Sequence, residues 1–137
     1  MSKVLLPLDF GLPAGTSLEL LTALRKIAIA FNRADDQPTM PTFENGWDNF
    51  GAPQQDVGYY KDNNGRVWLR GAIKDGTIGA VPAFTLPEGY RPAAWEHFDV
   101  ESNHAFGSVQ IADDGQVQVR DGDPTHVSLS GISFRAA

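Results

Sequence analysis

The sequence predicts a mostly β protein built from antiparallel hairpins, with a single helix near its N-terminus. Two observations carry this prediction. The 137 residues include 14 glycines and 9 prolines, many at regular spacing, which is typical of short strands joined by tight turns. Only one segment, before residue 34, has helical periodicity, so folds that alternate strands with helices are excluded.

The amino-acid composition argues against several classes of function. The chain has no cysteine, and therefore no disulfide and no thiolate site for a metal or a redox reaction. Its net charge is −6 and no basic stripe is present, so we expect neither nucleic acid nor an anionic membrane as a partner. The apolar run at the N-terminus is short and is broken by Pro7 and Asp9, which fits neither a signal peptide nor a membrane span.

Four segments follow one another along the chain. We expect an extended arm over residues 1–15, a helix over 16–32, a linker over 33–42 and a β head domain over 43–137. Thr16 and Glu19 fit a capping box, in which each side chain bonds to a free amide at the start of the helix. Pro38 and Pro41 exclude a helix from the linker and favour an extended path.

The predicted helix has a wide apolar face. Four of its residues, spaced four, three and four apart, form a seam of the coiled-coil type: Leu20, Leu24, Ile27 and Phe31. Three more widen the face, which suits three chains better than two: Leu18, Leu21 and Ala28. The alternative is a helix that lies on the sheet of its own domain. Two heptads do not decide between these arrangements.

Two hairpins can be placed in register from their turns. Pairing Ile111 with Val117, and Val109 with Val119, leaves a three-residue loop over 113–115 that ends in glycine, where the backbone needs a positive φ. The earlier hairpin repeats this chemistry with a loop over 63–65. It then pairs Asp62 with Arg66, so that opposite charges face each other, and Tyr59 with Leu69. A two-residue Asn-Gly turn is the alternative there.

This register assigns the two faces of the third predicted strand. We expect four residues to point inward: Val67, Leu69, Gly71 and Ile73. Four others point outward: Arg66, Trp68, Arg70 and Lys74, with Tyr60 opposite Trp68. In the last strand the inward positions change phase between Leu129 and Ile132, which predicts a β-bulge at Gly131. The segment "TLPEGYRP" is expected to be a turn with Pro87 at its second position, leading into a strand near Trp95.

An ordered set of segments resembles a known family. "GRVWLRGAIKDG", "FTLPEGYRP", "GSVQIADDGQVQV" and "VSLSGISFRA" are similar to the C-terminal head domain of tail-fibre and receptor-binding proteins of bacteriophages of Gram-positive hosts. The resemblance implies an antiparallel β-sandwich or jelly roll, a homotrimer on a stem, location in the virion and binding of a cell-surface saccharide. The arm would then contact other virion proteins. Tail fibres are longer than this chain, so a small fibre or spike elsewhere on the virion fits as well.

Exposed aromatic residues are the candidates for a saccharide site, because the flat face of a sugar packs on an aromatic ring. We select Trp68 with Tyr60, and Trp95 with His97, as ligand-binding residues. The alternative for the first pair is packing against a neighbouring subunit. Trp47 is expected in the core or between stem and head.

Nothing in the sequence selects a catalytic, metal or cofactor site. His97 and His104 can be combined with Asp99 and Glu101, but exposed polar loop residues explain them equally well. The Asp-Gly segments 113–115 and 121–123 are turn signals before they are calcium loops. The alternatives to an attachment protein are a structural virion component without a receptor, a polysaccharide hydrolase and a bacterial carbohydrate-binding module.

Overall fold

The computed structural model describes residues 17–33 and 37–137, and the chain divides into two compact units at Pro38. The N-terminal unit contains one helix, α1 (Leu18–Arg33), close to the predicted range. The Ser17 hydroxyl accepts a hydrogen bond from the backbone N–H of Leu20 at 3.4 Å, so Ser17 is the N-cap instead of the expected Thr16, which lies outside the described residues.

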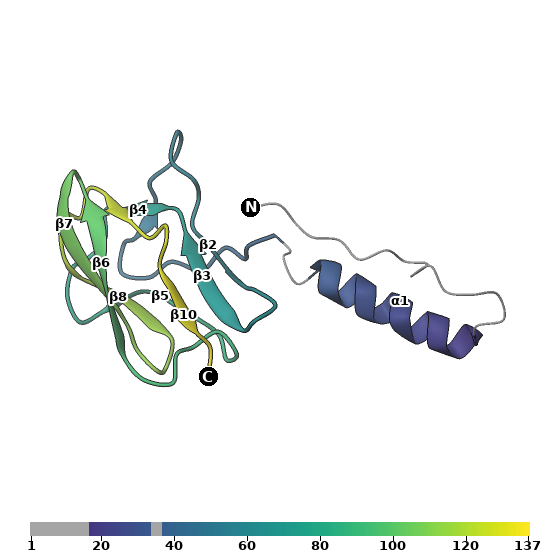
Figure 1. Cartoon of the computed structure of the whole chain (residues 1–137). Coiled ribbons are helices and arrows are strands. Elements are labelled where there is room, and N and C mark those ends of the chain that lie inside the picture. The colour runs from purple at the N-terminus through teal and green to yellow at the C-terminus, as the bar shows by residue number, and fades with distance from the viewer. Residues whose placement is uncertain (1–16, 34–36) are drawn as a thin grey trace. The chain divides into compact units, whose positions relative to one another are not determined.

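The second unit contains three antiparallel sheets (Figure 1). The first has the order β1 (Asp48–Asn49), β4 (Ala72–Lys74), β9 (Val127–Ser128). The second has the order β10 (Ser133–Arg135), β3 (Arg66–Arg70), β2 (Gly58–Lys61). The third has the order β5 (Pro82–Thr85), β8 (Gln116–Asp121), β7 (Ala105–Ile111), β6 (Glu96–Ser102).

Both predicted hairpin registers are confirmed. In β7–β8, Ile111 pairs with Val117 and Val109 with Val119, and the loop glycine has φ +91°. In β2–β3, Tyr59 pairs with Leu69, and the loop glycine has φ +79°. The backbone N–H of Asp62 donates to the Arg66 oxygen at 2.9 Å, which closes a three-residue loop and excludes the two-residue alternative.

Two local predictions were wrong. Gly131, at φ +91°, lies in a turn and not in a bulge: β9 pairs with β4 and β10 pairs with β3, so the chain changes sheets between Leu129 and Ile132. The inward phase changes because the sheet changes. Pro87 occupies the first position of its turn and not the second, because the Tyr90 N–H donates to the Pro87 oxygen at 3.1 Å. This places Gly89, with φ +87°, at the third position, where a positive φ is required.

One hydrophobic core is shared by the three sheets, as the expected β-sandwich requires. Phe134 of β10 contacts Phe98 of β6 across it, with ring centroids 6.4 Å apart. Trp47 is buried in this core, as predicted, and its indole N–H donates to the Thr77 carbonyl at 3.2 Å. The expected inward residues of β3 and β4, among them Val67 and Leu69, are buried as well.

The unit boundary lies inside the predicted linker. Thr39 exchanges two backbone hydrogen bonds with Tyr59, at 2.9 and 3.0 Å, so the residues just after Pro38 are part of the β unit. In α1, Leu18, Leu20 and Ile27 are exposed. Leu24 is half-buried. The side chain of Phe31 lies outside the described residues, as does the arm over 1–15.

Candidate functional site

The tip of the β6–β7 hairpin carries several chemically active side chains. Strand pairing runs to Ser102 and Ala105, which leaves Asn103 and His104 as a two-residue turn with φ of 48° and 64°. Positive φ at both central positions is the type I′ geometry that matches the twist of a hairpin. The Glu101 carboxylate accepts the backbone N–H of His104 at 2.5 Å, so the turn holds Glu101 beside His104.

The loop between β8 and β9 packs against this tip. The Ser102 hydroxyl is buried and bonds to the backbone of Asp123 and of His126 at 2.8 Å each. The Asp123 carboxylate accepts hydrogen bonds from the backbone and hydroxyl of Thr125 and from the Asn103 amide, and these bonds hold the pKa of Asp123 below its usual value. The Ser102 hydroxyl therefore joins the two loops.

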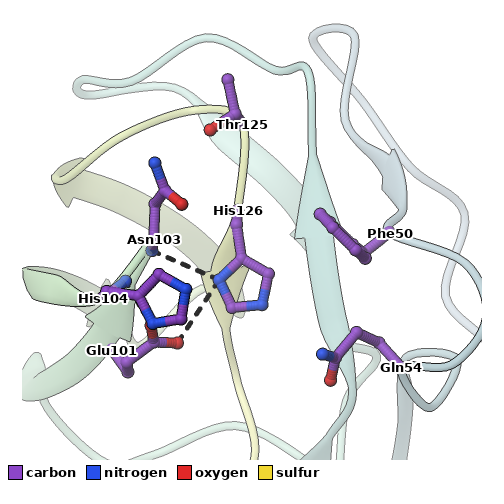
Figure 2. A pocket seen from close by; sticks show the side chains of 7 residues that line it. All are labelled: Phe50, Gln54, Glu101, Asn103, His104, Thr125 and His126. Atoms are coloured by element: carbon purple, nitrogen blue, oxygen red, sulfur yellow. Dashed lines mark hydrogen bonds and ion pairs between the residues drawn. The ribbon is translucent and has the colours of Figure 1, made fainter.

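The imidazole of His126 lies where the two loops meet (Figure 2). Its Nδ1 is 3.3 Å from the backbone N of Asn103 and 3.3 Å from Oε2 of Glu101. A neutral ring accepts the Asn103 N–H at Nδ1, whereas a protonated ring pairs with Glu101. The Phe50 ring meets His126 edge to face, with centroids 4.9 Å apart. The ring of His126 is thus fixed on both sides.

These side chains line an open pocket of about 620 Å³, which Figure 2 shows: Phe50, Gln54, Glu101, Asn103, His104, Thr125 and His126. A second pocket of about 520 Å³ shares Glu101 and His104 with the first and is also lined by Asp99, Val100, Ala105, Ser128 and Ser130. We call the two together the Glu101 groove. Its lining combines aromatic rings, amides, hydroxyls and carboxylates.

The structure brings together part of one constellation that the sequence suggested. Asp99, Glu101 and His104 line the second pocket, whereas His97 lines neither. No signal in the sequence connects His126 with these residues, because His126 is far along the chain from the hairpin tip and belongs to no local motif. The Asn103-His104 pair between two strand-like runs was the one local signal for the tip.

Three of the four residues selected as ligand-binding lie on two different sheets, and the fourth, Trp95, precedes one of their strands. Tyr60 and Trp68 are direct partners on β2 and β3, and both are half-buried. Trp95 precedes β6 and is exposed, and His97 is exposed on β6 opposite Gln110. Among the residues that the structure describes, no hydrogen bond or ring contact joins the two pairs.

The Asp-Gly segments have turn-forming roles. Asp114 accepts the backbone N–H of Gln116 at 3.1 Å, and Asp123 accepts that of Thr125 at 2.9 Å. Within the described ranges, no group of three or more His, Cys, Asp or Glu residues could hold a metal ion.

Comparison with family models, with curated proteins and with solved structures finds no match for this chain. None of the helices over the described residues is long and apolar enough to cross a membrane.

Proposed function

We propose that this chain is an attachment protein of a bacteriophage virion, in which a trimer of β heads with a jelly-roll topology binds a cell-surface saccharide. The resemblance of the ordered segments after residue 43 motivates this proposal, and the antiparallel β unit agrees with it. The observation that carries the binding function is the Glu101 groove. Its two adjoining pockets share Glu101 and His104 and combine polar with apolar lining, which suits a saccharide ligand.

The groove offers the contacts that a sugar requires. The Phe50 ring supplies an apolar surface for the C–H face of a sugar ring. Glu101 accepts hydroxyl hydrogen bonds, and the Gln54 amide both donates and accepts them. Glu101 is half exposed and His104 is almost fully exposed, so these polar groups are reachable from solvent. The proposed mechanism is binding, with no covalent step.

The helix supports the multivalent part of the proposal. A 16-residue helix is marginally stable alone in water, so its exposed Leu18, Leu20 and Ile27 favour association with identical helices. Three weak saccharide sites gain avidity when they act together. The mass in solution tests this step: light scattering should give about 45 kDa, three times the 14.9 kDa of one chain, and Leu20→Ser with Ile27→Ser should give the monomer mass.

A pair of neighbouring glutamines allows a matched test of the groove. Gln54 lines it and Gln55 does not, and both are exposed. On a panel of immobilised bacterial polysaccharides, Gln54→Ala should weaken binding by about threefold, and Glu101→Gln by about tenfold, whereas Gln55→Ala should leave it unchanged.

Three outcomes would refute parts of the proposal. Binding that is lost in Trp68→Ala or Trp95→Ala, but kept in Glu101→Gln, would move the saccharide site to the aromatic residues. A trimer that binds no polysaccharide would favour a structural virion component. Release of reducing ends from a bound polysaccharide would show a hydrolase instead of a binding protein.

A further inference from the structure

The outer face of the β10–β3–β2 sheet collects cationic and aromatic side chains. Val67 and Phe134 are buried direct partners on β3 and β10, so the residues that alternate with them face outward. We call these outward residues the arginine–aromatic face: Arg66, Trp68, Arg70, Tyr60 and Arg135. None of them lines the Glu101 groove.

The charges on this face are not balanced. Arg66 and Arg135 are direct cross-strand partners, an arrangement in which like charges repel. Over residues 17–33 and 37–137, no carboxylate lies within ion-pair distance of Arg66, Arg70 or Arg135. The nearest acid on the face, Asp62, accepts the backbone N–H of Arg66 and the Trp68 indole N–H, at 3.0 Å each. The Arg66 guanidinium donates to the Ser133 hydroxyl at 2.9 Å and to the Ser133 carbonyl at 3.3 Å, and its charge helps to lower the pKa of Asp62. The three arginines thus carry positive charge without a carboxylate at ion-pair distance, and an anion from outside would balance this charge.

Arg70 is held in a specific position without a partner. Its Nε is buried and makes no hydrogen bond. Gly58 lies opposite Arg70 on β2, and a Cβ at Gly58 would come within 2.6 Å of Pro38 and 3.2 Å of this Nε. The absence of a side chain at Gly58 therefore makes room for the guanidinium group. A buried donor without an acceptor is unfavourable, and an anion reaching the guanidinium would offset that cost.

The aromatic residues on the face are fixed in place. The Trp68 indole is anchored to Asp62, the guanidinium carbon of Arg66 lies 5.9 Å from the centre of the Trp68 ring, and Tyr60 is its direct cross-strand partner. Arginines beside a rigid aromatic surface match a sugar ring that carries a negatively charged group: the ring packs on the aromatic surface and the guanidinium groups bond to the anion.

We propose that the arginine–aromatic face binds an anionic saccharide, with Arg66, Arg70 and Arg135 recognising phosphate or carboxylate groups along it. Both groups present paired oxygens that fit the fork of a guanidinium group. This site is separate from the Glu101 groove in its residues, so it gives the β unit a second surface for charged substituents.

Binding of the full chain to three immobilised polymers tests the proposal: phosphomannan carries phosphate, alginate carries carboxylate and dextran is neutral. We expect the chain to bind phosphomannan, alginate or both through this face, and this binding should weaken as salt is added. Dextran should not bind at this face. The double substitution Arg66→Gln with Arg70→Gln should weaken binding at least about tenfold. Arg120→Gln is the matched control for each single substitution, Arg66→Gln or Arg70→Gln, because it removes one arginine charge from β8, where the guanidinium bonds to Gln110 and Gln118.

A second measurement needs no variant. Inorganic phosphate or acetate should shift the Trp68 indole N–H resonance in the NMR spectrum of the wild-type chain, while glucose should not. The proposal is overturned if neither polyanion binds, or if Arg120→Gln weakens binding as much as each single substitution does. If the Glu101→Gln variant no longer binds a neutral polysaccharide but still binds the polyanions, the two sites are separate.

Discussion

Asp62 is expected to be the main anchor of the β2–β3 hairpin. One carboxylate oxygen accepts the backbone N–H groups of Asn64 at 2.9 Å and Arg66 at 3.0 Å, and the other accepts the Trp68 indole at 3.0 Å. Asp62→Ala removes all three hydrogen bonds. We allow about 1 kcal/mol for each hydrogen bond, which is below the range for a charged acceptor because the site is partly solvated. The free energy of unfolding should then fall by about 3 kcal/mol.

The second hairpin provides the control. Asp114 accepts two hydrogen bonds, both from Gln116, at 3.1 and 3.2 Å, and both are exposed. Asp114→Ala should therefore cost about 1 kcal/mol. Asp62→Asn keeps one acceptor oxygen for the turn, so its loss in free energy of unfolding should lie between those of Asp62→Ala and Asp114→Ala.

Urea unfolding followed by tryptophan fluorescence measures this difference. With a slope of about 1.5 kcal/mol per molar urea, Asp62→Ala should lower the unfolding midpoint by about 2 M. The slope should stay unchanged if only stability is altered. If Asp62→Ala shifts the midpoint no further than Asp114→Ala does, the carboxylate does not anchor the hairpin and the reasoning fails.

Two further predictions concern the turns. Gly115→Ala should lower the free energy of unfolding by about 3 kcal/mol, because the φ of Gly115 is +91° and a Cβ there would meet the Leu86 carbonyl oxygen. Gly65 has φ +79° and open space around it, so Gly65→Ala should cost only about 1 kcal/mol. Equal thermal unfolding midpoints for the two variants would contradict this prediction. Burial acts to raise the pKa of Asp62, but hydrogen bonds from Trp68 and the turn outweigh it, and the pKa of Asp123 is also lowered. The two carboxylates therefore stabilise the fold fully at pH values above their ordinary pKa near 3.8, and this stabilisation is lost as the pH falls through their lower pKa values in the folded protein. In the double variant Asp62→Asn with Asp123→Asn, the free energy of unfolding measured by acid titration should depend less on pH below 3.8.

The candidate site was only partly predictable. Glu101 and His104 lie close together in the sequence, and the alternation of β6 puts Asp99 on the same face as Glu101. Phe50 and His126 come from loops that are distant from each other in the sequence, and no local pattern links them to the β6–β7 tip. The contact exists because Ser102 is buried against the β8–β9 loop.

The sequence by itself determined the features that depend on neighbouring residues. Alternating apolar positions and a glycine at the end of each loop specified both hairpin registers, because strand faces repeat every two residues and a positive φ favours glycine. Helical spacing specified α1 in the same way.

Only the tertiary structure decided which strands share a sheet and which loops meet. β9 and β10 are adjacent in the chain but join different sheets, because β9 pairs with β4 and β10 pairs with β3. The arginines on β3 and β10 likewise became neighbours through the pairing of Arg66 with Arg135. Such pairings depend on contacts between residues distant in the sequence, and the alternation of a single strand carries no information about its partner.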